Sequence, residues 1–176
     1  MVADGPAETV RLRPLAEADL AIFEGDYSSR DGAGEYQWFG FSPPGRGLAE
    51  MGALDASGGR LTAMVEDRVI GSVFWFRKEY GPPETSWCWE IALHVRKDER
   101  GRGLGTQATR LVSGYLFSHT RAHRLQALTD TKNHVMQAVL AKCGYTHEGT
   151  LRSAQWREAA WHDYRVYSLL RSDGGY

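Results

Sequence analysis

A basic, glycine-rich turn separates a strand-like segment from a helix-like segment near the middle of this chain. Residues 87–95 form an apolar run typical of a strand, and the turn that follows reads Arg-Lys-Asp-Glu-Arg-Gly-Arg-Gly-Leu-Gly. Apolar residues then recur with helical spacing through 104–116. The first helical turn leaves backbone N–H groups unpaired and partly positive, and glycines let a backbone approach a phosphate closely. The turn therefore predicts an anion site; the alternative is a glycine-rich loop that only caps the helix.

The spacing of the glycines separates several kinds of anion site. A Walker loop ends in Gly-Lys-Ser/Thr, whereas Gly105 is followed by Thr106 and Gln107. Residues 103–108 fit the G-x-G-x-x-A string of dinucleotide-binding domains, but they lie in mid-chain and five charged residues separate them from the strand. A nucleotide-binding domain remains an alternative, and it predicts affinity for ATP or NAD.

Arg100, Gly103 and Gly105 stand at the three defining positions of the Q/R-x-x-G-x-G/A loop. In that respect the chain resembles the GNAT superfamily of acyl-CoA N-acyltransferases. Its surroundings resemble the subgroup that includes ribosomal-protein N-terminal acetyltransferases. The matching positions, which run from about residue 9 to about residue 170, include Glu90-Ile91-Ala92-Leu93-His94-Val95, Asn133, Gly144-Tyr145, Glu148-Gly149, Arg152, Asp163 and Tyr167.

The order of predicted elements also fits this family. Local patterns predict strands at 9–13, 61–65, 69–76, 85–95, 124–129, 145–152 and 164–170, and helices at 17–27, near 48–54, at 102–119 and at 133–143. Residues 28–47 are expected to be a long loop and 171–176 a frayed tail. The resemblance implies one GNAT domain over 1–176, of α/β (α+β) class. Its mixed, mostly antiparallel sheet of about seven strands is flanked by helices and splayed at the strand before the pyrophosphate loop.

Composition and net charge limit the number of domains and the classes of partner that the chain can be expected to have. The chain has 176 residues, 42% hydrophobic and 24% charged, which favours a single soluble domain, and its net charge of −1 gives no argument for nucleic acid or an anionic membrane. The residues before Pro6 lack a signal-peptide core, and Cys88 and Cys143 have neither disulfide nor metal-ligand spacing. We expect a cytoplasmic monomer or homodimer that needs no metal.

The resemblance implies how acetyl-CoA is held. The amides of Leu93, His94 and Val95 are expected to pair with the pantetheine arm. The loop from Arg100 to Thr106, with Gly101, Arg102, Gly103 and Gly105, is expected to cradle the pyrophosphate. Asn133 is expected to bind the pantetheine arm or a water rather than to cap its helix. Lys142 is expected to reach the 3′-phosphate, and a solvated surface lysine is the alternative. The serine and tyrosine that many relatives use are replaced by Met136 and Leu140.

Acetyl transfer to an amine needs a base. Strand alternation places Cys88, Glu90, Ala92 and His94 on one face. Glu90 is the favoured general base because a carboxylate among aromatic residues is costly unless it is paired or functional. His94 is the second candidate; a structural role for Glu90 and a covalent route through a cysteine are the alternatives.

The acceptor side is predicted from the aromatic segment between the glycine- and proline-rich stretches. Glu35, Tyr36 and Trp38 are expected to bind the acceptor, and a packed loop is the alternative. The expected activity is direct N-acetyl transfer from acetyl-CoA to a primary amine, either a protein N-terminus or a small amine. A GNAT-fold protein that binds acyl-CoA without turnover, as a sensor or a partner, is the alternative function.

Overall fold

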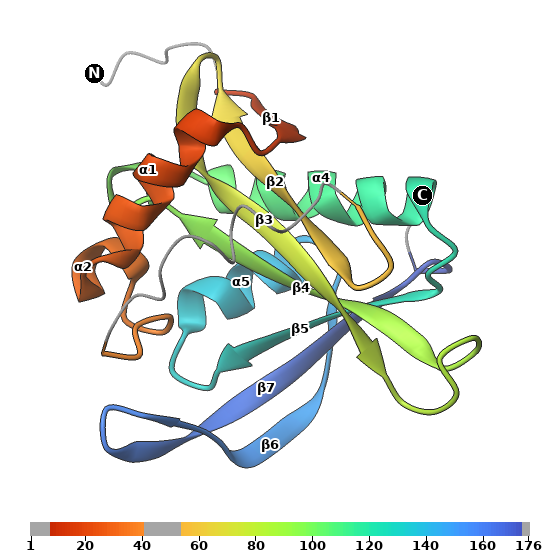
Figure 1. Cartoon of the computed structure of the whole chain (residues 1–176). Helices are drawn as coiled ribbons and strands as arrows, with labels where there is room; N and C mark the ends of the chain where they lie inside the picture. The colour runs from red at the N-terminus through yellow and green to blue at the C-terminus, as the bar shows by residue number, and fades with distance from the viewer. Residues whose placement is uncertain (1–7, 41–53, 174–176) are drawn as a thin grey trace, which may run out of the picture.

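The computed structural model describes residues 8–40 and 54–173 (Figure 1). The chain forms seven strands, four α-helices and one short 3-10 helix in those ranges. Their order is β1 (Val10–Pro14), α1 (Glu17–Tyr27), α2 (Arg30–Ala33), β2 (Gly58–Val65), β3 (Arg68–Glu79), β4 (Trp87–Val95), η1 (Lys97–Glu99), α4 (Leu104–His119), β5 (Arg124–Asp130), α5 (His134–Lys142), β6 (Thr146–Arg157) and β7 (Ala160–Leu170).

The strands form one open sheet in the order β1-β2-β3-β4-β5-β7-β6. Every neighbouring pair is antiparallel except β4 and β5, which run parallel. Helices α1 and α2 lie in front of the sheet in Figure 1, and α4 and α5 lie behind it. The seven-stranded, mostly antiparallel sheet between helices confirms the predicted fold class, and it differs from the doubly wound parallel sheet of a dinucleotide-binding domain.

Strand alternation divides β4 as the sequence predicts. Trp89 and Ile91 belong to the main core behind the sheet, together with Leu104 and Ala108 of α4. Glu90 and His94 are buried on the opposite, front face. The apolar face holds the long helix that follows the glycine loop, so the polar residues of β4 are left to face the α1 side of the molecule.

The sheet separates between its two parallel strands. β4 and β5 pair only at Trp89 with Leu125 and at Glu90 with Gln126, although β4 continues to Val95 and β5 to Asp130. β5 stays paired with β7 along its whole length. The predicted splay therefore begins one residue after Glu90, and β4 has an open backbone edge from Ile91 to Val95.

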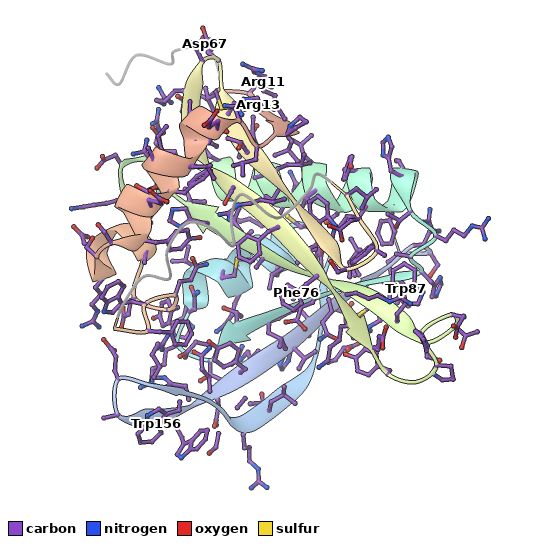
Figure 2. The ribbon with its side chains drawn as sticks, viewed as in Figure 1. Arg11, Arg13, Asp67, Phe76, Trp87 and Trp156 are labelled. Carbon is purple, nitrogen blue, oxygen red and sulfur yellow. The ribbon has the colours of Figure 1, made fainter. Side chains whose placement is uncertain are left out.

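The β6–β7 hairpin and the short helix α2 differ from the sequence expectation, because their residues do not predict the backbone conformations found. The β6–β7 hairpin is longer than predicted, and its two-residue turn is Glu158-Ala159, both with positive φ (50° and 57°). Such turns favour Asn-Gly or Asp-Gly, so this pair gave no hairpin signal. Trp156 projects from the hairpin (Figure 2), where its ring meets that of Trp161 at 5.4 Å. Ser29 caps the short helix α2, which the sequence analysis placed in a loop.

The start of the predicted tail is anchored. The Arg171 guanidinium donates to the carbonyls of Phe117, Thr120 and Ala122, so it closes the C-terminal end of α4 rather than fraying. The helix predicted near 48–54 lies almost wholly outside the described residues. No helix in the described ranges is long and apolar enough to span a membrane.

Asp19 joins the first helix to the sheet. Its carboxylate, 2% exposed, accepts hydrogen bonds from Arg13 of β1 (2.5 and 2.8 Å), from Thr62 of β2 (2.8 Å) and from the amide of Ala16 (2.9 Å). The hydrogen bond from Arg13 is the main reason that the pKa of Asp19 falls from 3.8 to about 2. This carboxylate fixes the angle at which α1 crosses the front of the sheet.

We expect Asp19→Asn to lower the free energy of unfolding by about 2 kcal/mol at pH 7, the equivalent of the pKa shift. Because the folded pKa is depressed, the stabilisation is present above the unfolded pKa and is lost as the pH falls toward about 2. Urea denaturation at several pH values measures this difference. Glu17→Gln, in the same helical turn but exposed, is the control; an equal loss in both variants, or a loss independent of pH, would contradict the assignment.

Candidate active site

The open edge of β4 presents selected backbone groups to the gap. The amide of Arg96 donates to the carbonyl of Ile70 across the β3–β4 ladder (2.9 Å), and hydrogen-bonded pairs alternate along antiparallel strands. The register therefore directs the N–H and C=O of His94 to β3 and those of Leu93 and Val95 to the gap. The sequence analysis included the His94 amide among the pantetheine contacts; the register excludes it and keeps the other two.

Two side chains already hold the carbonyls of this edge. Gln37 donates to the carbonyl of Leu93 at 2.7 Å, and Arg100 donates through Nε to the carbonyl of Val95 at 2.9 Å. The amides of Leu93 and Val95 have no acceptor among the described residues. A bound chain with its own carbonyls in this gap would extend the sheet by pairing with those amides.

The glycine loop forms a nest of backbone amides at the start of α4. Gly101 and Gly103 adopt positive φ (77° and 76°), which glycine reaches without strain. The carbonyl of Gly103 accepts from Thr106 and Gln107, and the Arg100 amide donates to Lys97. The five amides from Gly101 to Gly105 have no acceptor within the described ranges. Unpaired N–H groups in a glycine-rich turn at a helix N-terminus can bind a phosphate.

The two arginines of the loop have structural partners. Arg100 binds the carbonyls of Asp31 and Gly32 as well as that of Val95, and so ties α2 to the end of β4. Arg102 pairs with Glu8 and with the largely buried Glu99, both at 2.6 Å. The loop's capacity to hold an anion therefore rests mainly on its backbone.

Gly105 allows α4 to lie close to β4. A Cβ at this position would stand 3.3 Å from Leu93 and 3.5 Å from Val95, whereas a Cβ at Gly103 would meet no atom within 4 Å. Gly105 thus allows close packing of α4 on β4, and Gly103 allows the left-handed backbone and leaves space for a ligand beside it.

Of the two cofactor-binding candidates at α5, Asn133 has a structural role and Lys142 is exposed to solvent. Asn133 Oδ1 accepts from the amide of Met136 at 3.1 Å, so Asn133 is the N-cap of α5. Asp130, three residues before Asn133, accepts from the amide of Lys132. The capping role, which the sequence analysis set second, is therefore present, and the amide nitrogen of Asn133 is left for a ligand. Lys142 is exposed near the end of α5.

Glu90 is the carboxylate at the point where the strands part. Its side chain, 8% exposed, accepts through Oε2 from Gln126 of β5 at 2.9 Å. The side-chain oxygen Oε1 of Gln126 in turn accepts from the Tyr80 hydroxyl and from Arg124. Burial raises the pKa of Glu90 above its ordinary value, although the Gln126 hydrogen bond and Lys78 oppose the shift. An oriented carboxylate of raised pKa is suited to accept a proton.

His94 lies on the same face but in a different environment. It is 1% exposed, its Nε2 is 3.2 Å from Asp26, and its ring packs 4.8 Å from that of Tyr27. These partners belong to α1, so the histidine joins that helix to β4. The two catalytic candidates of the sequence analysis are not brought together, and the surroundings of Glu90 suit a base better.

The predicted acceptor segment crosses the gap. Tyr36 donates to the carbonyl of Lys132, beyond β5, at 3.1 Å, while the neighbouring Gln37 holds β4. Glu35 is exposed and lies 4.0 Å from Arg30, and Trp38 is half-buried. Segment 35–37 therefore bridges both strands of the splay.

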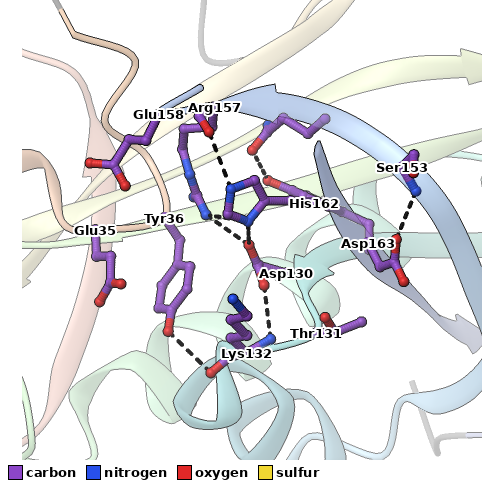
Figure 3. Close-up of polar contacts among 12 residues, drawn as sticks. Glu35, Tyr36, Asp130, Thr131, Lys132, Ser153, Arg157, Glu158, His162 and Asp163 are labelled. Carbon is purple, nitrogen blue, oxygen red and sulfur yellow. Dashed lines mark hydrogen bonds and ion pairs between the residues drawn. The ribbon is translucent and has the colours of Figure 1, made fainter. Parts of the chain in front are cut away.

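A buried polar cluster that the sequence analysis missed lies next to Tyr36 (Figure 3). Asp130 at the end of β5 accepts from Arg157 of β6 at 2.7 Å and lies 2.9 Å from His162 of β7. The Arg157 guanidinium lies 5.3 Å from the centre of the Tyr36 ring. Sequence offered no sign of this cluster, because its members meet only through the unpredicted extension of the hairpin.

The cysteines and the metal-ligating side chains add no further site among the described residues. Burial raises the pKa of both cysteine thiols, Cys88 and Cys143, above the ordinary value, which disfavours the thiolate that a covalent route needs. Within the described residues no group of histidine, cysteine and carboxylate side chains is arranged to hold a metal ion.

Comparison with known proteins decides the family. The model of the acetyltransferase (GNAT) domain matches residues 9–146. The chain belongs to the GNAT acetyltransferase family. It is 32% identical over 108 residues to a probable N-acetyltransferase of Bacillus subtilis, YjcK, and the match covers 61% of this chain and 58% of that relative. The chain thus spans less than two thirds of the relative's length.

Solved structures of GNAT proteins share the fold. Spermidine N-acetyltransferase of Vibrio cholerae, in complex with CoA and spermine, superposes with a TM-score of 0.81 at 18% identity, over 94% of this chain and 97% of that one. Mycobacterium smegmatis RimJ, in complex with CoA-disulfide, gives a TM-score of 0.79 at 19% identity, over 97% and 86%. At such identities the likeness concerns the fold.

We expect CoA to raise the melting temperature of the protein, with a stabilisation of about 2.7 kcal/mol at 100 times the dissociation constant. Gly103→Val should abolish that shift, because a β-branched residue cannot hold the left-handed conformation that aims the loop amides. The free space at this position means that no packing clash accompanies the change.

Gly40→Val is the matched control, since Gly40 also has positive φ (93°) and open space but lies outside the loop. Thermal shift with and without CoA measures both variants. A normal CoA response in Gly103→Val, or an equal loss in the two variants, would contradict the role of the nest.

Proposed function

We propose that this protein transfers the acetyl group of acetyl-CoA directly to a primary amine. The observation that carries the proposal is the coincidence of three features at one gap: the free amides of β4, the amide nest of α4 and the buried Glu90. Each supplies what a different part of the reaction needs. The family membership gives the chemistry its class.

The cosubstrate would be held by backbone groups. The amides of Leu93 and Val95 would pair with the pantetheine arm, and the amides of Gly101 to Gly105 would bind the pyrophosphate. Neither set requires a particular side chain, which fits the structural partners of Arg100 and Arg102. Asn133 through its amide nitrogen and Lys142 are further candidate contacts for the pantetheine and the 3′-phosphate.

Glu90 would act as the general base. The amine nitrogen attacks the thioester carbonyl, the C–N bond forms as the C–S bond breaks, and Glu90 takes the proton that the nitrogen loses. Gln126 keeps the carboxylate directed toward the gap. The departing thiolate takes up a proton from solvent, because the positions where relatives carry serine and tyrosine hold Met136 and Leu140.

The acceptor would enter from the front of the sheet. Glu35 supplies negative charge for an ammonium group, and Tyr36 and Trp38 supply aromatic surface. The charge of the whole chain favours no acceptor, so a protein N-terminus and a small amine are both included in the proposal.

Release of free thiol from acetyl-CoA across a library of amines tests the proposal and identifies the acceptor. We expect thiol release that depends on the amine, with one acetyl group found on the product for each thiol released. CoA binding without release on any amine would favour a protein that senses acyl-CoA without turnover.

Glu90→Gln should reduce turnover about 100-fold and leave acetyl-CoA affinity unchanged. The acidic limb of the pH–rate profile should disappear with it, because that limb reports protonation of the base. Since burial raises the folded pKa of Glu90, ionisation opposes folding as the pH rises through that pKa. The variant should therefore be more stable than the wild type at neutral pH and no more stable at acid pH.

Steady-state kinetics and urea denaturation over a range of pH measure these two effects. Glu79→Gln is the control, since Glu79 is an exposed acid on the neighbouring strand. An unchanged pH profile in Glu90→Gln would remove Glu90 from the reaction.

A further inference from the structure

Arg157 holds buried hydrogen-bond donors that have no acceptor in the part of the chain that the structure describes. The residue is 3% exposed, and its Nη2 binds Asp130 at 2.7 Å and contacts His162 Nδ1 at 3.2 Å. Its Nε and Nη1 are buried without a hydrogen-bond partner among the described residues. Buried donors of a charged group almost always form hydrogen bonds, because burying them without an acceptor costs free energy. Two donor atoms without a hydrogen bond on one side chain call for a partner outside the described residues.

The cover over these donors belongs to the segment that bridges the gap. The ring of Tyr36 lies over the guanidinium, and Figure 3 shows Tyr36 and His162 on either side of it. The segment is flanked by Gly34 and Gly40, both with positive φ (91° and 93°). Tyr36 is held from below by one hydrogen bond, to Lys132, so a modest movement of this segment uncovers Arg157.

The position of Arg157 relates it to the reaction. Its partner Asp130 lies four residues beyond Gln126 on β5, on the same face of the sheet, and Gln126 binds Glu90. Four residues of strand span about 13 Å. The donors of Arg157 and the base therefore lie at opposite ends of one front-facing strip, with the β4–β5 gap beside it.

We propose that Arg157 is a specificity-determining residue whose Nε and Nη1 bind a neutral carbonyl oxygen of the acceptor, remote from the reacting amine. This inference rests on the proposed function and adds to it the class of acceptor: a primary amine that carries an amide about 10 Å away, as an extended chain of three residues does. Asp130 already neutralises the guanidinium, and Glu35 and Glu158 lie nearby (Figure 3), so a carboxylate is disfavoured at the same position.

The test compares three acceptors of similar length: triglycinamide, triglycine with its free carboxylate, and octanediamine, which has no oxygen. We expect the wild type to prefer triglycinamide. Arg157→Lys keeps a cation beside Asp130 and removes the fork of donors, so kcat/KM for triglycinamide should fall about 10- to 100-fold. The value for octanediamine should change little.

Arg165→Lys is the matched control, since Arg165 lies on the same hairpin but binds Gln137 of α5. Tyr36→Ala provides a second variant, which leaves the buried ion pair intact and removes aromatic surface that all three acceptors share; the preference for triglycinamide should remain. A preference lost in Tyr36→Ala, or an equal fall for all acceptors in Arg157→Lys, would overturn the inference. Preference for triglycine would overturn it in favour of carboxylate recognition. Absence of thiol release with any acceptor in the wild type would count against the proposed function itself.

Discussion

The loss of pairing between β4 and β5 is the feature on which the rest of the site depends. Parallel strands normally continue their ladder, but here it stops after Glu90 and Gln126 while each strand stays paired on its other side. The outer pairings are antiparallel and long, so they hold the two halves of the sheet apart without unfolding either. The gap leaves backbone N–H groups of β4 unpaired among the described residues, and such groups at a strand edge can pair with an extended ligand.

Glu90 gains its chemical character from the same place in the sheet. At the last paired rung it is deep enough for burial to raise its pKa, yet it lies beside the gap where a ligand can reach it. Gln126 satisfies one oxygen across the rung. One residue earlier the side chain would point to the opposite face, and four residues later His94 is enclosed by α1. The position of Glu90 in the sheet, more than its being a glutamate, makes it suited to act as a base rather than as a structural acid.

Local patterns predicted the elements of this fold well where the residues themselves impose the backbone. The alternation along 87–95 and the glycines at 101, 103 and 105 predict the strand, its faces and the amide nest. The extension of the β6–β7 hairpin could not be predicted, because Glu158 and Ala159 adopt positive φ against their preference. The Asp130–Arg157–His162 cluster follows from that extension and was missed with it. Asn133 illustrates a different limit, since capping and ligand binding place the same residue at the same position.

Amide chemical shifts during a CoA titration test the central claim most directly, because the claim concerns individual backbone groups. The account predicts large shifts for the amides of Leu93, Val95 and Gly101 to Gly105, and small shifts for Ala92 and His94, whose amides face β3. Shifts spread evenly along β4, or confined to residues outside the gap and the loop, would contradict it.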